Sequence, residues 1–243
     1  FRARYANMVK RNFGGRQVQL VVSYRRLDEL ADILDKFSYR VLKEDCLDLP
    51  EKVFTKRLVE LTPEQDKAYK QMKQMALAML DNGEVMTTVN VMTQLMRLHQ
   101  ITCGHFKADD GTTTALKNNR MDALLQLLEE TDGKVIIWAN YREDIKNIVA
   151  ALKKAYGDAS TVEYHGGVDS TLRQEHIAQF QQKNGPTRYF VGNAQTGGYG
   201  ITLTAANTVI YYSNSYDLEK RLQSEDRTER IVSARLAVLP MLT

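Results

Sequence analysis

The stretch Lys134-Val-Ile-Ile-Trp-Ala139 is a short apolar run of the kind that forms a strand buried on both faces. Further strand-like runs lie at 161–164, 187–191 and 208–212, and helix-like segments lie at about 119–130, 140–156 and 170–182. Strands that alternate with helices of roughly 10–15 residues are typical of right-handed crossovers. The sequence therefore predicts an α/β fold, with a parallel sheet covered by helices on both faces.

Functional loops in such a sheet lie at the carboxyl ends of its strands. Four segments follow the predicted strands: Asn140-Tyr-Arg142, His165-Gly-Gly167, residues 192–200, and Ser213-Asn214. We expect all four at one edge of the sheet, which would be the active face.

The residues before this region divide into two further segments. The first forty residues are charged and helix-like, so we expect helices within 1–48. Residues 49–118 read as a strand followed by a helical subdomain, whose first helix begins at Thr62-Pro63-Glu64-Gln65 with a hydroxyl cap and proline at the first helical position. A polar, turn-like stretch at 106–118 marks the boundary of the α/β core, residues 119–243.

Composition excludes several classes of protein. The chain has 243 residues, 43% hydrophobic and 26% charged, with a net charge of +3, which is ordinary for a globular protein. The two cysteines, Cys46 and Cys103, suit a reduced cytoplasmic protein, and no apolar run is long enough to span a membrane. Cys103 lies near His99 and His105, but without a paired Cys-x-x-Cys we expect a buried thiol and surface histidines, and no metal site.

A glycine-rich turn, Gln195-Thr-Gly-Gly-Tyr-Gly200, lacks the third spaced glycine of a dinucleotide-binding fingerprint, and an apolar run follows it instead of a helix. Its glycines suit close approach of the backbone to a phosphate. Further on, Arg227 and Arg230 are three residues apart, so a helix would point both at one target. A solvated helix paired with neighbouring acids is the alternative for the arginines. For His165, a role in holding its turn and a contact with nucleic acid both stay open.

Seven segments in series resemble the second half of the Swi/Snf-type translocases, in superfamily two of the helicase-like ATPases. The resemblance covers nearly the whole chain. Its segments are Tyr24 to Leu30 with Tyr39 to Asp45, Leu49 to Lys52 with Leu61 to Tyr69, Arg97-Leu98-His99-Gln100-Ile101, Lys134 to Trp138, Tyr164-His165-Gly166 with Arg173 and Phe180, the glycine turn, and the arginine-containing segment 223–231. It implies that 1–48 connects two ATPase lobes, that 49–118 is a strand with a helical protrusion, and that 119–243 is a RecA-like helicase C-terminal core of the P-loop NTPase type.

The resemblance also implies roles for residues that match the family's motifs. Arg227 and Arg230 would be arginine fingers that stabilise charge on the transferred γ-phosphate. Gln223, Gly198 and Gly200 would lie at the nucleotide. Contacts with the backbone of double-stranded DNA, without sequence preference, would come from Asn140, Tyr141, Arg142, His165, Thr196 and Gly197.

Two departures from the family stand out. Ala194 replaces a hydroxyl residue that the family often has three positions before the first glycine of the turn, and Thr196 is a candidate to take its place. After Ile231 the family continues with Gly-Gln, whereas this chain reads Val232-Ser-Ala-Arg-Leu-Ala-Val238. Codons exist for this tail that restore the family ending after insertion of one nucleotide, so a one-nucleotide deletion is our hypothesis for residues 232–243. The coding DNA sequence tests it.

Two elements of the ATPase site are missing from the sequence: a Gly-x-x-x-x-Gly-Lys-Ser/Thr loop, and an Asp-Glu pair at the end of an apolar strand. In the family they belong to the first lobe, which binds ATP and Mg²⁺. The chain opens with Phe1-Arg-Ala-Arg rather than methionine, so we expect a fragment that neither hydrolyses ATP nor translocates alone. Its compact protrusion suggests a phage or bacterial protein. The alternatives are a strand-separating helicase of the same superfamily and a non-catalytic nucleic-acid-binding module.

Overall fold

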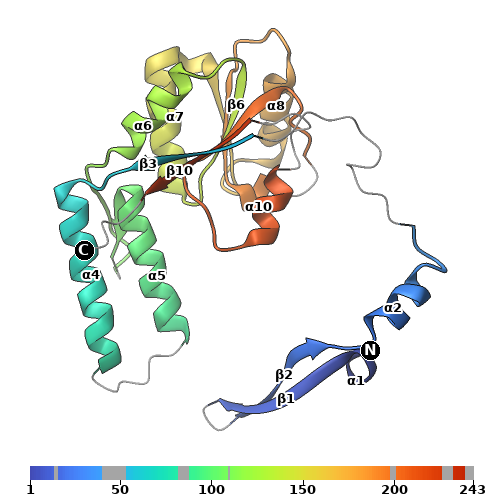
Figure 1. Ribbon diagram of the computed structural model, residues 1–243. Helices are drawn as coiled ribbons and strands as arrows, with labels where there is room; N and C mark the ends of the chain where they lie inside the picture. Colours follow the sequence, from blue (N-terminus) through green and yellow to red (C-terminus); the bar gives the residue numbers. More distant parts are fainter. Residues whose placement is uncertain are drawn as a thin grey trace. The chain divides into compact units, whose positions relative to one another are not determined.

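The structure is a computed structural model that describes residues 1–13, 16–39, 53–81, 88–108, 110–197, 201–225 and 232–238. The chain divides into two compact units, Phe1–Leu49 and Pro50–Thr243. Figure 1 shows the elements of each unit.

The first unit contains a β-hairpin. Strand β1 (Ala6–Phe13) pairs antiparallel with β2 (Arg16–Tyr24), between helix α1 (Arg2–Tyr5) and helix α2 (Leu27–Leu34). The prediction of helices throughout residues 1–48 was therefore wrong for 6–24. The sequence has Gly14-Gly15 between the two strands and β-branched residues within them, both of which are hairpin signals that the charged neighbours obscured.

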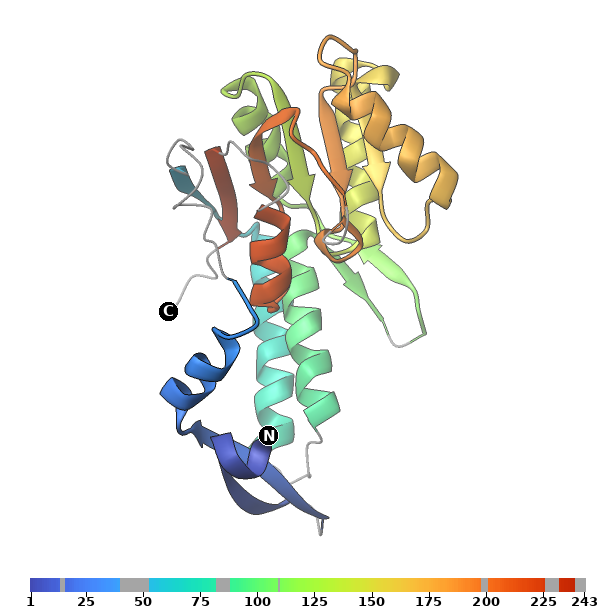
Figure 2. The same ribbon diagram turned by 90° about the vertical axis from the view of Figure 1, so that its right-hand side faces the viewer.

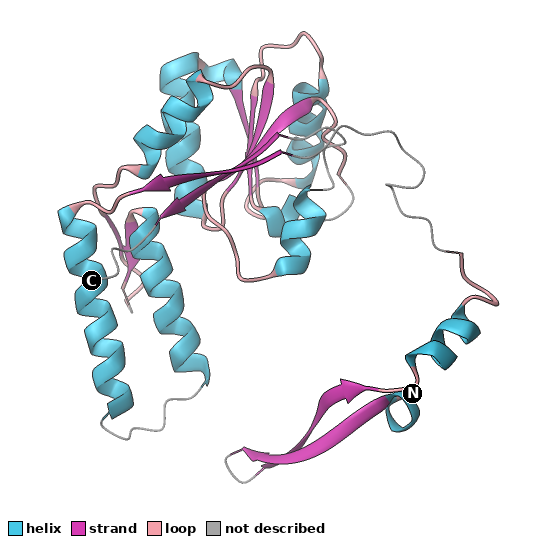
Figure 3. Ribbon diagram, viewed as in Figure 1, coloured by secondary structure: helices cyan, strands magenta, loops and turns pink. Residues whose placement is uncertain are grey.

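The second unit is built on a parallel sheet of six described strands, in the order β3-β10-β9-β6-β8-β7 (Figure 3). Every neighbouring pair is parallel, which confirms the predicted fold class. The strands are β3 (Val53–Val59), β10 (Val232–Val238), β9 (Ala206–Tyr211), β6 (Lys134–Trp138), β8 (Tyr189–Gly192) and β7 (Thr161–Tyr164).

Both faces of the sheet are covered, and β6 shows why. Its alternate residues enter two separate cores: Val135 and Ile137 pack on one side, Ile136 and Trp138 on the other, and all four are fully buried. Helices α6 (Arg120–Glu129) and α7 (Arg142–Tyr156) cover the first face, and α8 (Ser170–Gln181) covers the second (Figure 1). Because β6 is a central strand buried on both faces, its sequence is continuously apolar.

Two helices, α4 (Pro63–Asp81) and α5 (Thr88–Cys103), follow β3 in the sequence. They pack side by side (Figure 2). The predicted start of α4 is confirmed as a capping box: Gln65 N donates to Thr62 Oγ1 and Thr62 N donates to Gln65 Oε1, each at 3.2 Å. Residues 106–118, expected as turns, include an antiparallel hairpin of β4 (His105–Lys107) and β5 (Thr113–Ala115).

The remaining elements are short. A 3-10 turn, η1 (Asp158–Ser160), precedes β7, while α9 (Ala194–Gly197) and α10 (Leu218–Glu225) follow β8 and β9. The backbone of the unusual tail forms β10, which lies between β3 and β9. Among the helices in the described ranges, none is long and apolar enough to cross a membrane.

Candidate functional site

The loops that follow the strands meet at one edge of the sheet, as the sequence predicted. Asn140 N donates to Ser213 Oγ at 2.8 Å, and Asn193 Nδ2 donates to Asn140 O at 2.8 Å. Asn193 N also donates to Tyr164 O at 3.0 Å. These bonds join the ends of β6, β7, β8 and β9. The edge encloses a small pocket with a volume of about 20 Å³, enough for about one water molecule, lined in part by Asn140, Gln195 and Ser213.

Arg142 lies beside the His165-Gly166-Gly167 turn at this edge. A Cβ atom placed on Gly167 would be 3.0 Å from His165 Cε1 and 3.6 Å from Arg142 Nη1, so the two side chains pack closely around this glycine. Within the described residues, no carboxylate forms an ion pair with Arg142. The structure therefore brings two of the predicted nucleic-acid residues, Arg142 and His165, together around a small, open turn.

His165 has an internal role in that turn. Its Nδ1 accepts a hydrogen bond from Gly167 N at 3.0 Å, which places the ring proton on Nε2, 3.6 Å from Glu163 Oε2. This bond gives His165 the turn-holding role, one of the two roles that its sequence position left open. The contact with nucleic acid stays a prediction.

Asn140 and Arg142 flank the start of α7, and no side chain caps that N-terminus. The first backbone N–H groups of a helix have no partner within the helix, and they carry a partial positive charge. Arg142 adds a full positive charge at the same place, and the acidic residues Glu143 and Asp144 lie in the same turn. The guanidinium of Arg142 and the backbone amides are hydrogen-bond donors of the kind that suits an anionic group.

Tyr141 turns into the protein instead. Its hydroxyl lies 3.0 Å from His99 Nδ1, and its ring meets His105 edge-on with 5.1 Å between centroids. Burial, with the neighbouring Cys103, raises the pKa of the Tyr141 phenol. Burial and the charge of Arg120 lower the pKa of His99 to about 4, so this imidazole is neutral at pH 7. The predicted contact of Tyr141 with nucleic acid stays untested, but its side chain serves an internal contact.

The prediction of surface histidines near Cys103 was wrong for His105, which is 4% exposed, and His99 is only partly buried. His105 Nδ1 lies 3.2 Å from Asp144 Oδ1 inside the fold. Cys103 is buried as expected, and burial raises the pKa of its thiol to about 12, which keeps it protonated. Among the described residues, no group of three His, Cys, Asp or Glu side chains is arranged to hold a metal ion.

The nucleotide side of the predicted site is described only in part. Gln223 lies on α10, where its Nε2 donates to Glu219 Oε1 at 2.9 Å. Thr196 and Gly197 lie on α9, whose first turn is held by Asn193. Gly198, Gly200, Arg227 and Arg230 lie outside the described residues. Their predicted roles stay predictions.

Sequence reasoning missed Arg221, which anchors α10. Its Nε lies 2.5 Å from Glu225 Oε1, its Nη1 donates to Asn214 Oδ1 at 2.9 Å, and its guanidinium lies over the Tyr211 ring. Tyr211 OH is in turn 2.6 Å from Ser224 Oγ. The i, i+4 spacing of Arg221 and Glu225 was the signal that could have found it.

Comparisons with known families match two consecutive parts of the chain. The SNF2-related domain matches residues 3–107, and the helicase conserved C-terminal domain matches residues 119–232. The chain belongs to the Snf2-type helicases. Within that family it corresponds to the C-terminal lobe.

Individual relatives support the same assignment. YwqA of Bacillus subtilis is 27% identical over 229 residues, covering 87% of this chain and 24% of its own length. The uncharacterized ATP-dependent helicase MG018 of Mycoplasma genitalium is 27% identical over 202 residues, or 82% of this chain and 19% of its own. The chain thus spans about a quarter or less of the length of these curated relatives.

A solved structure shares the fold. The SWI2/SNF2 ATPase core of Sulfolobus solfataricus, in complex with double-stranded DNA, superposes with a TM-score of 0.62 at 24% identity. The match covers 90% of this chain and 48% of that one. At this level of identity the similarity establishes the RecA-like fold of the lobe. It does not assign roles to single residues.

Proposed function

We propose that the protein containing this chain is an ATP-dependent translocase on double-stranded DNA, in which this lobe contacts the sugar-phosphate backbone. The observation that carries the proposal is the position of Arg142, at the uncapped start of α7 and beside the glycine turn at residues 165–167. Phosphate is the ligand that such a set of donors suits, and it gives no sequence preference. The names of MG018 and of the Sulfolobus core support helicase-type activity and duplex DNA as the partner.

The nucleotide chemistry in this proposal involves a first lobe outside the chain. That lobe would bind ATP and Mg²⁺, because residues 1–243 include neither the phosphate-binding loop nor the acidic pair that these ligands need. This lobe would supply Arg227 and Arg230 to stabilise the charge that develops on the γ-phosphate, with Gln223 beside them. On its own the chain is expected to be inactive as an ATPase. A phage or bacterial origin also stays part of the proposal.

The DNA-binding part can be tested on the chain itself. Arg142→Ala should weaken binding to a fluorescently labelled duplex by about tenfold or more, because it removes a charged hydrogen-bond donor. It should also reduce the slope of log K against log salt by about 0.9, which corresponds to one phosphate contact. Fluorescence anisotropy over a range of salt concentrations measures both quantities.

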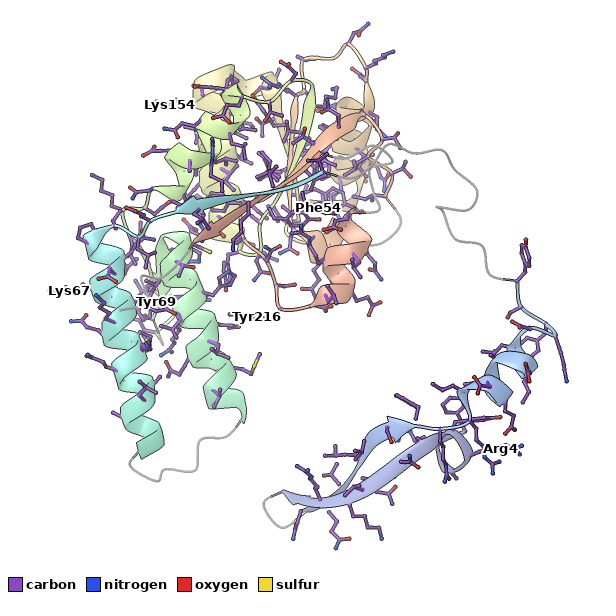
Figure 4. The ribbon with its side chains drawn as sticks, in the orientation of Figure 1. Arg4, Phe54, Lys67, Tyr69, Lys154 and Tyr216 are labelled. Carbon is purple, nitrogen blue, oxygen red and sulfur yellow. The ribbon has the colours of Figure 1, made fainter. Side chains whose placement is uncertain are left out.

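Lys154→Ala is the matched control. Lys154 is an exposed basic residue in the last turn of the same helix, at the opposite end from Arg142 (Figure 4). It should leave affinity and slope close to those of the original chain. If the two variants weaken binding equally, the effect is one of net charge, and the edge is not the DNA contact.

The catalytic part is tested on the full-length protein by ATPase assays with duplex or single-stranded DNA. Arg227→Ala and Arg230→Ala should each reduce duplex-stimulated ATPase by about 10³-fold. Preferential stimulation by single strands, with strand displacement, would instead favour a strand-separating helicase. An ATPase rate that is changed neither by DNA nor by the two arginine substitutions would favour a non-catalytic binding role for this lobe.

A further inference from the structure

A buried chain of polar contacts connects the helical pair to the edge of the sheet. It begins at His105 on β4, directly after α5, where Nδ1 lies 3.2 Å from Asp144 Oδ1. Asp144 Oδ2 accepts a hydrogen bond from Ser213 Oγ at 2.9 Å, and Ser213 Oγ accepts one from Asn140 N at 2.8 Å. His105, Asp144 and Ser213 are 4%, 2% and 4% exposed.

The order of these groups excludes a hydrolytic triad. A nucleophilic serine must bond to the histidine that takes its proton, with the carboxylate behind the histidine. Here Asp144 stands in the middle, Ser213 donates to the carboxylate, and the serine oxygen already accepts from Asn140 N. None of the three side chains opens to solvent, so the set can hold backbone in place but cannot attack a substrate.

Asp144 explains why the set is rigid. A buried carboxylate is stable only when donors surround it, and removal of one donor leaves a charge that costs several kcal/mol. His105 and Ser213 provide two of these contacts. Each of them lies on a different element, so the carboxylate fixes β4, α7 and the segment after β9 relative to one another.

A second contact runs beside the first. Tyr141 OH lies 3.0 Å from His99 Nδ1 on α5, and the Tyr141 ring packs against His105. Tyr141 is therefore held by α5 directly, through its hydroxyl, whereas Asn140 is held through its backbone N–H by Ser213, which in turn bonds to Asp144. The next residue is Arg142, whose backbone position follows from theirs.

We propose that His105 and Asp144 are positioning residues, which hold the segment 140–142 in the geometry that contacts a DNA phosphate and so couple the helical pair to the DNA-binding edge. This inference rests on the proposed function of that edge. Neither side chain touches the DNA, since both are buried. Their effect is exerted through Asn140 and Arg142.

The test uses the 243-residue chain and a labelled DNA duplex. His105→Phe keeps an aromatic ring but removes the donor to Asp144, and His105→Asn restores a donor close to the position of Nδ1. His105→Phe should weaken duplex binding by about tenfold and reduce the salt slope toward that of Arg142→Ala. His105→Asn should stay within about twofold of the original affinity. Fluorescence of Trp138, the single tryptophan, shows whether each variant is folded.

The salt slope separates positioning from general stability, because a folded variant that keeps Arg142 in place keeps its phosphate contact. If His105→Phe does not fold, Ser213→Ala decides, since it removes the hydroxyl that joins Asp144 to Asn140 N; we expect a loss of affinity of about threefold or more with a reduced slope. A folded His105→Phe, or failing that a folded Ser213→Ala, with the affinity and slope of the original chain overturns the inference. Failure of the original chain to bind duplex would instead contradict the proposed function.

Discussion

His99 provides a quantitative prediction about stability and pH. Burial lowers the pKa of its imidazole from 6.5 to about 4, with Arg120 and His105 acting in the same direction and Asp144 opposing them. In the unfolded chain the pKa returns to its ordinary value. Between pH 6.5 and pH 4 the unfolded chain therefore binds a proton that the folded chain does not, and the unfolded state is favoured.

The size of the effect follows from the two pKa values. Each unit of difference corresponds to about 1.4 kcal/mol, so a fall from 6.5 to about 4 corresponds to about 3 kcal/mol. This contribution is fully present above pH 6.5, declines as the pH falls, and is lost at about pH 4. At its steepest, near pH 5, it changes by about 1.4 kcal/mol per pH unit.

The perturbation is His99→Asn, which keeps an oxygen able to accept from Tyr141 OH but cannot titrate in this range. Urea unfolding followed by Trp138 fluorescence gives the free energy of unfolding at several pH values. Subtracting the two curves removes the titration of other groups. The original chain should lose about 3 kcal/mol more than His99→Asn between pH 7 and pH 4, and parallel curves would refute the assignment of His99 as a buried neutral imidazole.

Three further predictions concern stability and are measured by the same unfolding assay. Gly192→Ala should destabilise the fold by about 1–3 kcal/mol, because its Cβ would lie 2.7 Å from the carbonyl oxygen of Tyr164; an unchanged midpoint would show that the backbone shifts freely. Thr62→Ala should cost about 1 kcal/mol through loss of the cap of α4, and Thr62→Ser should restore it. Arg221→Met should cost about 2 kcal/mol, because it removes the ion pair with Glu225 and the hydrogen bond to Asn214; an unchanged free energy of unfolding would contradict the anchoring role.

The sequence predicts the α/β core well because its strands are buried on both faces. Such strands are continuous apolar runs, and the residues that follow them must meet at one edge, so Asn140, His165 and Ser213 could be grouped from the order of the strands alone. The capping box at Thr62 could also be predicted from the sequence, because both of its hydrogen bonds form within four residues.

The remaining features depend on contacts between distant residues. His105 on β4 and Asp144 on α7 are separated in the sequence by β5, α6 and β6, and nothing in the sequence indicates that a charged residue in the first turn of α7 turns inward. The histidines near Cys103 looked like surface residues for the same reason. In the hairpin 6–24, apolar and polar residues do not alternate strictly along either strand, and pairing between the strands decided the outcome.

The buried contacts behind Arg142 also bear on how tightly this edge can bind DNA. Fixing the backbone of one residue costs about 1–2 kcal/mol of conformational entropy, so a loose segment of three residues would lose about 3–6 kcal/mol when it becomes ordered on DNA. The bonds of Asn140 to Ser213 and of Tyr141 to His99 order that segment when the protein folds. Binding then needs little further ordering, and a single phosphate contact retains most of its free energy. Since His99 and His105 lie at the end of the helical pair, a displacement of that pair would release the segment and weaken the DNA contact without any change at Arg142 itself.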